Sequence, residues 1–244
     1  PRVVLIPVMV VAGVVGGGLW GLIPAFFKCR YGTNETLFTL MLNYIALYLI
    51  AFLRDGPWRD PANPGFAKIA TFEKNAQLPK VFGVHIGWIF ALVLLAFVWV
   101  YLKYTKQGYE ISVVGESQAT ARYSGMNVKK IILRTMFMSG AIAGIAGMAQ
   151  AAGSDATLAS GVAGGVGFTA IIVAWLGNLN PGSIFIISAL FSILEKGSSV
   201  VQSNFGLSTD CADVLQGIIL FFILGCEFFI RYKFVIRGKD GAGA

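Results

Sequence analysis

Charged residues are scarce in this chain of 244 residues: Asp, Glu, Lys and Arg make up 13% of it, roughly half of their share in an ordinary soluble domain. There is one histidine, and the three cysteines lie far apart without the spacing of a metal site. These shortages exclude a soluble globular protein and a disulfide-stabilised scaffold. Hydrophobic residues make up 56% of the chain and the mean hydropathy is +0.73, which excludes a disordered chain. The composition therefore predicts an all-α fold, a polytopic bundle of transmembrane helices.

The net charge of +7 would suggest nucleic-acid binding in a soluble protein. In this chain the basic residues lie between apolar runs, so we interpret them as loop residues that set membrane orientation, and we expect no nucleic-acid partner. Placing the N-terminus outside the cell puts most of the basic residues in cytoplasmic loops, as the positive-inside rule requires. The same orientation makes residues 54–85 an extracytoplasmic loop and residues 103–134 a cytoplasmic loop.

Apolar runs of about 20 residues, the length that crosses about 30 Å of hydrocarbon, mark the expected spans. The long run after Ala156 is broken near Asn180 and Pro181, which can cap and begin a new helix. The first half of that run is short and rich in glycine, so it can be either a full span or a re-entrant helix. We therefore expect about seven spans within a single transmembrane domain, 1–244. Their approximate ranges are 3–27, 36–53, 81–102, 135–154, 162–178, 181–196 and 214–230.

Small residues recur at helical spacing in two of these spans. Gly13, Gly17 and Gly21 repeat every four residues in the first span. In the fourth span Gly140, Gly144, Gly147 and Ala151 form a similar stripe. Such stripes allow two helix backbones to approach closely, so we expect close packing, without any implication for function.

The chain begins with Pro-Arg rather than Met, and it is already apolar at Val3. No charged leader segment and no cleavage site precede the first span, so no signal peptide is expected. We expect the chain to be a fragment of a longer protein that lacks N-terminal spans.

The span 36–53 carries a polar face formed by Thr39 and Asn43, with Tyr44 beside it. Hydrocarbon cannot satisfy an Asn side chain in mid-span, so Asn43 needs a polar partner. It can form an interhelical hydrogen bond, or it can line a translocation path. The same two alternatives hold for Gln150, near the outer end of the fourth span.

The spans contain no cluster of Asp, Glu, Lys or Arg. Proton-driven and sodium-driven carriers usually depend on such charges, so a stand-alone secondary carrier is the weaker alternative. No set of His and Glu ligands and no Asp pair is present, so we expect neither a metal site nor an enzyme. The phosphate-binding motif Gly-x-x-x-x-Gly-Lys-Ser/Thr is also absent, so this chain does not itself bind ATP there.

The loop 103–134 is the most specific feature of the sequence. Residues 117–124 suit a short helix, which Glu116 or Ser117 can cap and Gly125 can end in a left-handed conformation. An exposed helix held between two spans is a natural docking site for a partner. The alternative is a plain amphipathic connector.

Four stretches carry a resemblance to a known family. Residues 115–127 (GESQATARYSGMN) resemble the cytoplasmic coupling segment of ABC-importer permeases of the branched-chain amino acid, ribose and nucleoside branch. Residues 28–46 (KCRYGTNETLFTLMLNYIA) and 165–181 (GVGFTAIIVAWLGNLNP) are similar to stretches of the nucleoside-type permeases, as is GPWRDP at 56–61. The resemblance covers essentially the whole chain.

The resemblance implies a permease subunit of the bacterial cytoplasmic membrane that translocates nucleosides or related small solutes, with ribose-like sugars as the alternative. It implies no cofactor in this chain, and as partners a second permease subunit, a separate ATPase, an extracytoplasmic solute-binding protein and membrane lipid. It also assigns two groups of residues. The expected ATPase-coupling residues are Gly115, Glu116, Ala119, Ala121, Arg122, Gly125 and Asn127. The expected pathway residues are Thr39, Asn43, Tyr44, Gln150, Phe168 and Trp175, where the aromatic rings of Phe168 and Trp175 either stack on a base or sugar or pack in the core.

Overall fold

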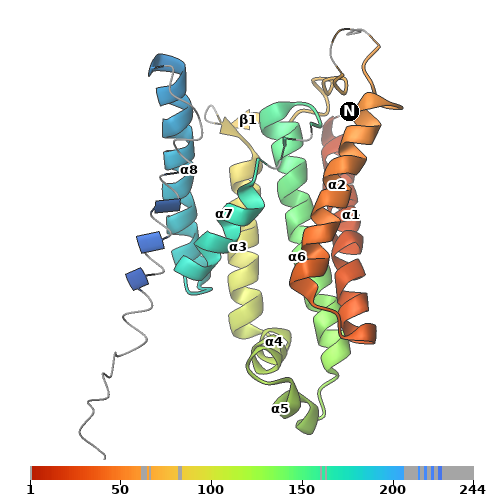
Figure 1. Cartoon of the computed structure of the whole chain (residues 1–244), viewed down its shortest axis with the longest axis vertical. Coiled ribbons are helices and arrows are strands. Elements are labelled where there is room, and N and C mark those ends of the chain that lie inside the picture. Colours follow the sequence, from red (N-terminus) through yellow and green to blue (C-terminus); the bar gives the residue numbers. More distant parts are fainter. Residues whose placement is uncertain are drawn as a thin grey trace, which may run out of the picture. The chain divides into compact units, whose positions relative to one another are not determined.

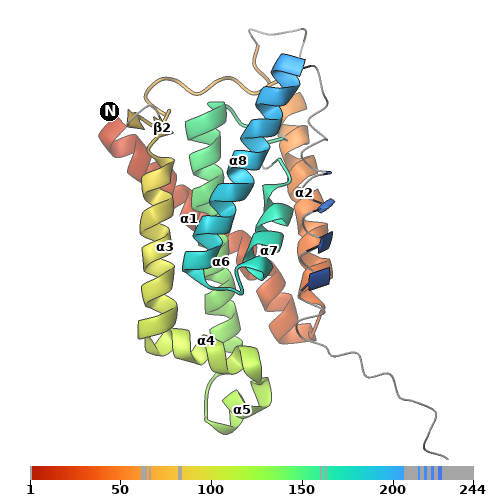
Figure 2. The same ribbon diagram turned by 90° about the vertical axis from the view of Figure 1, so that its left-hand side faces the viewer.

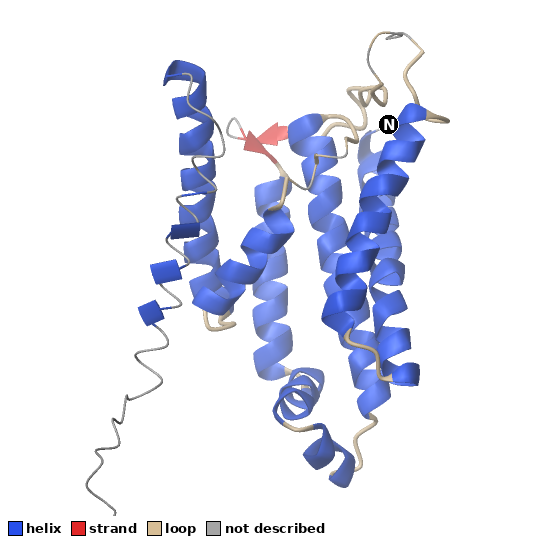
Figure 3. Cartoon of the chain, in the orientation of Figure 1, coloured by secondary structure: helices blue, strands red, loops and turns tan. Residues whose placement is uncertain are grey.

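The computed structural model is almost entirely helical (Figure 3). It describes residues 2–61, 65, 67–81, 84–159, 161, 162, 164–205, 214, 217, 218, 221, 222, 225 and 226. The chain divides into two compact units, Pro1–Gly164 and Gly165–Ala244, and each is described by itself.

The first unit is a bundle of long helices (Figure 1). Its long helices are α1 (Arg2–Tyr31), α2 (Glu35–Asp55), α3 (Gly87–Tyr104) and α6 (Val128–Gln150), which continues into a π-helical turn, η1 (Ala151–Asp155). Two shorter helices, α4 (Lys106–Glu116) and α5 (Gln118–Tyr123), join α3 to α6. A two-residue antiparallel hairpin, β1 (Lys80–Val81) and β2 (Val84–His85), precedes α3.

Five helices of the described residues are long and apolar enough to cross a membrane: α1, α2, α3, α6 with η1, and α8 (Pro181–Phe205). The bundle class is confirmed, whereas the expected number of about seven spans is imprecise for two reasons. The helix α7 (Val166–Leu176) has only 11 residues, about 16 Å at 1.5 Å per residue, too short to cross 30 Å of hydrocarbon. The expected span 214–230 lies mostly outside the described residues.

The glycines of α1 and α6 face each other, and the two backbones touch. A Cβ atom added to Gly21 would lie 2.7 Å from the carbonyl oxygen of Met136, and one added to Gly17 would lie 2.8 Å from Cα of Gly144. A Cβ on Gly13 would lie 3.0 Å from the carbonyl oxygen of Gly144. The predicted close packing is therefore confirmed, and it forms the centre of the first unit.

Gly147 is the exception in the predicted stripe, because no atom lies within 4 Å of an added Cβ there. The helix α6 turns this position away from α1. Ala151 and Ala152, one turn further on, are buried, but under a different segment of the chain.

That segment is the loop between α2 and α3, which is tied to the end of α6 by hydrogen bonds. The backbone N–H groups of Phe72 and Leu78 donate to the carbonyls of Ala156 (2.7 Å) and Ala152 (3.0 Å). The hydroxyl of Thr157 donates to the carbonyl of Ile69 at 3.1 Å. Ile69 and Leu78 are both buried, so the loop forms an ordered cover over this end of α6.

The hairpin next to this cover holds His85 against the same turn. Nδ1 of His85 accepts a hydrogen bond from the backbone N–H of Gly87 (3.3 Å), and Nε2 lies 3.3 Å from the hydroxyl of Ser154. These contacts make His85 a link between the loop and η1.

The second unit begins with α7 and continues into α8 through the turn at Gly177–Asn180. The side-chain oxygen of Asn180 accepts from the backbone N–H of Gly182 (3.1 Å), and α8 starts at Pro181. The predicted cap and helix start at these two residues are confirmed.

Candidate functional site

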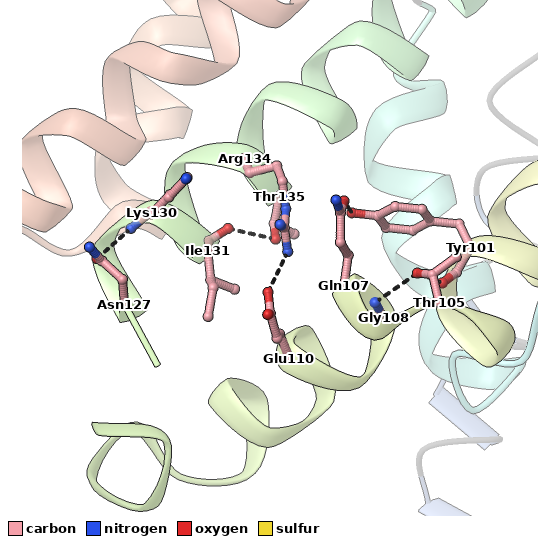
Figure 4. A network of polar contacts seen from close by, with 10 residues as sticks. All are labelled: Tyr101, Thr105, Gln107, Gly108, Glu110, Asn127, Lys130, Ile131, Arg134 and Thr135. Carbon is pink, nitrogen blue, oxygen red and sulfur yellow. Dashed lines mark hydrogen bonds and ion pairs between the residues drawn. The ribbon is translucent and has the colours of Figure 1, made fainter. Parts of the chain in front are cut away.

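The connection between α3 and α6 starts with a sharp corner at Thr105. The Thr105 hydroxyl donates to the carbonyl of Tyr101 (2.6 Å) at the end of α3 and accepts from the N–H of Gly108 (3.1 Å) in α4. The Tyr101 hydroxyl donates to the side-chain oxygen of Gln107 at 2.8 Å. Gly108 is buried, and a Cβ there would overlap the carbonyl oxygens of Tyr101 and Leu102. These contacts fix how α4 is oriented relative to α3 (Figure 4).

From this corner, α4 runs across the ends of α3 and α6 (Figure 2). An ion pair braces it to α6: Nη2 of Arg134 donates to Oε2 of Glu110 at 3.1 Å. Both side chains are mostly buried, with 26% and 20% of their surface exposed. We call α4, α5 and this ion pair the coupling arm.

The coupling arm ends in α5, whose two ends are capped by local chemistry. The Ser117 hydroxyl accepts from the N–H of Thr120 (3.3 Å), which is an N-cap. At the other end Gly125 has φ +75°, and its N–H donates to the carbonyl of Arg122 (3.0 Å). The N–H of Met126 donates to the carbonyl of Ala121, also at 3.0 Å. Together these two bonds form a Schellman motif, which fixes how α5 turns back toward α6.

The predicted coupling residues lie together around α5, with one difference in exposure. Ala121 is completely buried within this chain. It packs α5 against the rest of the chain and is not accessible to a partner. Tyr123 is 94% exposed, although it was not among the predicted coupling residues. Asn127 accepts from the N–H of Lys130 at 3.1 Å and caps α6. The remaining predicted positions are exposed: Gly115, Glu116, Ala119, Arg122 and Gly125.

A polar cleft of about 670 Å³ separates α5 from the turn between α1 and α2. Arg122 and Gln118 line one side of this cleft, and Thr33 lines the other. An ion pair between Lys28 and Glu35 spans the α1–α2 turn. Arg122 is exposed where it lines this cleft.

The predicted pathway residues divide between the two units. Thr39 and Asn43 share a face of α2, with Tyr44 next to it, and all three are exposed. The Thr39 hydroxyl donates to the carbonyl of Thr36 in its own helix (3.0 Å), whereas the Asn43 side chain has no hydrogen bond within the described residues. Within the described residues Asn43 therefore makes no interhelical hydrogen bond, and both its interpretations, as a bonding partner and as a pathway residue, stay predictions.

The other pathway candidates are also exposed. Gln150 ends α6. Phe168 and Trp175 are seven residues apart on α7 and are 54% and 62% exposed, so neither ring is buried among the described residues. Phe168 and Trp175 belong to the second unit, whereas Asn43 belongs to the first.

Sequence reasoning missed the helix α4 and the Glu110–Arg134 pair. The local signal for α4 was present: Thr105 is a good N-cap residue, and it precedes the helix directly. The ion pair joins residues 24 positions apart, and no local pattern predicts such a contact.

Comparison with known proteins gives the family. A family model described as "Branched-chain amino acid transport system / permease component" matches residues 2–224. The chain belongs to this permease family. It is 31% identical to the glucose ABC transporter permease protein TsgB13 of Haloferax volcanii, over 98% of this chain and 67% of that protein.

Two other relatives of this permease are named for nucleosides. The guanosine ABC transporter permease protein NupP of Bacillus subtilis is 29% identical, over 99% of this chain and 71% of that protein. The nucleoside ABC transporter permease protein NupB of Lactococcus lactis is 30% identical, over 91% of this chain and 64% of that protein. No solved structure matches the chain.

These findings make the chain a membrane permease of an ABC importer, a transport subunit and not an enzyme. Its membrane-spanning helices make it a multi-pass protein of the cytoplasmic membrane. As a permease component it works within a larger transport system, with an ATPase and a solute-binding protein as partners in general.

Proposed function

We propose that this permease imports nucleosides or related small solutes, and that the coupling arm transmits the movement of a separate ATPase to the membrane helices. The observation that carries the coupling proposal is the exposed, doubly capped helix α5 at the end of a braced arm. The solute class is supported by the two relatives named for guanosine and nucleosides.

The proposed mechanism follows from how the coupling arm is attached. A partner that grips α5 through Arg122 and Tyr123 would pull on α4, because only Ser117 separates the two helices. The Thr105 corner passes this movement to α3, and the Glu110–Arg134 pair passes it to α6. Because α3 and α6 are attached at the same end, both tilt together and can alternate access across the membrane.

The proposed solute pathway includes the polar face of α2 and the exposed aromatic residues of α7. An Asn side chain without a partner in mid-span is costly against lipid, so Asn43 is better explained by a polar path. The rings of Phe168 and Trp175 offer flat apolar faces to a base or sugar. Gln150 supplies a further hydrogen-bonding group, and the second permease subunit, identical or paralogous, completes the path.

The experiment that tests the function measures uptake of labelled adenosine and uridine in membranes that contain the permease, its ATPase and its binding protein. The control replaces the lysine of the ATPase phosphate-binding loop, which removes ATP hydrolysis and leaves assembly intact. We expect uptake that requires the intact ATPase and that unlabelled nucleosides compete away. Nucleoside uptake with the inactive ATPase would contradict the importer mechanism and favour a stand-alone carrier.

A simple sugar is the second candidate solute, favoured by the 31% identity to a permease named for glucose. Competition by unlabelled glucose and ribose in the same assay separates the two solute classes. Competition by sugars alone would overturn the nucleoside proposal and leave the coupling proposal intact.

A further inference from the structure

A second hollow lies between α1 and the start of α6, and it shares Lys129 with the polar cleft at α5. This groove has a volume of about 490 Å³. Its floor is apolar, formed by Leu22, Leu133 and Phe137, and its rim is basic, formed by Lys129, Lys130 and Arg134. We call it the basic-rimmed groove.

The floor of the groove extends along α6 toward the middle of the membrane. Phe137 is nine residues after Val128, the first residue of α6, which places it about 14 Å along the helix axis. Its ring covers the backbone of Gly18, where an added Cβ would overlap it. The aromatic ring is thus fixed between α1 and α6, and it continues the floor from the end of the helices into the depth of the hydrocarbon.

Two of the three basic residues of the rim, Lys129 and Lys130, carry positive charge without an acidic partner in the part of the chain that the structure describes, whereas Arg134 is paired with Glu110. Lys129 and Lys130 are exposed and make no ion pair within the described residues, and the first turn of α6 contains no acidic residue. The N-terminus of α6 adds the positive end of its helix dipole. Arg134 contacts Glu110 through Nη2 only, and its Nε–H is buried without a hydrogen-bond partner.

We propose that the basic-rimmed groove binds an anionic phospholipid of the cytoplasmic leaflet. The phosphate lies between Lys129 and Lys130, and an acyl chain lies along Leu22, Leu133 and Phe137. Basic pockets between transmembrane helices on the cytoplasmic side are suited to anionic headgroups. An acidic protein segment would pair with the lysines, but it would leave the apolar floor that continues into the span uncovered.

The groove lies next to the coupling arm, because Arg134 belongs to both. A lipid phosphate on the rim adds an anion beside the guanidinium that holds Glu110. The lipid site is proposed in addition to the transport function and does not depend on which solute is carried.

The test measures lipid retention by native mass spectrometry on the full chain in detergent. Phosphatidylglycerol is titrated against phosphatidylcholine with identical acyl chains. The variant Lys129→Gln/Lys130→Gln is compared with Lys103→Gln/Lys106→Gln, which removes the same charge from the same end of the bundle away from the groove. Both lysines of the groove are exposed, and thermal unfolding of each variant checks that the fold is retained.

We expect the groove variant to bind phosphatidylglycerol at least roughly tenfold more weakly at low salt, since it loses two charge-assisted contacts to the phosphate. The control variant changes binding less than threefold, and phosphatidylcholine binding is equal in all three proteins. Equal losses in both variants would reveal general attraction of lipid to basic loops and overturn the proposal. Displacement of the lipid by soluble glycerol 3-phosphate or by a polyglutamate peptide at equal concentration would also overturn it.

Discussion

The helices α1 and α2 have similar hydropathy but differ in how closely they pack within the first unit. Both are long and apolar enough to span a membrane, but α1 touches α6 backbone to backbone through Gly13, Gly17 and Gly21, whereas α2 contains no buried residue. The difference follows from side-chain size at one face. Small residues allow a fixed contact between helices, whereas the large side chains and the polar positions of α2 are not buried by the described residues.

The same contrast separates the coupling arm from α2. The arm is fixed by a buried corner, two caps and a partly buried ion pair, so movement at α5 is transmitted. A helix that faces a solute, or that changes position during transport, must not be held by such fixed contacts. Packed elements and unpartnered elements therefore have different expected responses to substitution.

The largest effect is expected from Gly17→Ala in α1. The new Cβ would collide with the backbone of Gly140 and Gly144, which cannot move aside, and overpacking of this kind costs about 3 kcal/mol. Denaturation in mixed micelles measures the change. Gly16→Ala is the matched control, because no atom lies within 4 Å of its added Cβ. Equal stability of the two variants would show that the α1–α6 contact is looser than described.

The next effect is expected at the corner between α3 and α4. Gly108→Ala places a Cβ against the carbonyls of Tyr101 and Leu102, and we expect a loss of about 2 kcal/mol together with reduced ATP-driven uptake. Gly115→Ala in the same helix meets no atom, and it stabilises α4 by up to about 1 kcal/mol through helix propensity. Thermal unfolding should show lower stability for Gly108→Ala and higher stability for Gly115→Ala.

A smaller loss is expected from Glu110→Gln, which leaves the Arg134 guanidinium partly buried without its anion. The expected cost is about 1–2 kcal/mol, discounted because a quarter of the Arg134 side chain is exposed. Uptake should fall more than the stability change explains, because the coupling arm loses its attachment to α6. The control Asp55→Asn interrupts the exposed Arg54–Asp55 pair and should change neither quantity measurably. If Glu110→Gln loses stability and keeps full uptake, the pair does not transmit movement.

The features that sequence could predict are those that depend on near neighbours. The glycine spacing in α1 and the helix start at Asn180 and Pro181 involve contacts or caps that a periodic or local pattern encodes. The burial of Ala121 was not predictable, because a six-residue helix is too short to show which face is apolar. The Glu110–Arg134 pair was missed for a related reason, since it depends on how α4 crosses α6.

The least effect on stability, and the clearest effect on transport, is expected from Asn43→Leu. Asn43 has no hydrogen-bond partner within the described residues, so its loss should leave the unfolding of the isolated chain unchanged within about 0.5 kcal/mol. If Asn43 lines the solute path, uptake by the assembled importer falls at least tenfold, measured as initial rate over solute concentration. The control is Ile45→Leu, an exposed position on the opposite face of α2 from Asn43, which should transport normally.

The assembled importer also separates the two roles of Asn43. A hydrogen bond to another subunit would make Asn43→Leu destabilise the assembled complex while the isolated chain stays unchanged, since only the complex contains the partner. A pathway residue would leave both stabilities unchanged and alter transport alone, because water and solute satisfy the amide. Unchanged transport together with a weakened complex would remove Asn43 from the path and place it at the contact with the second permease, so the open surface of α2 would then be an assembly surface.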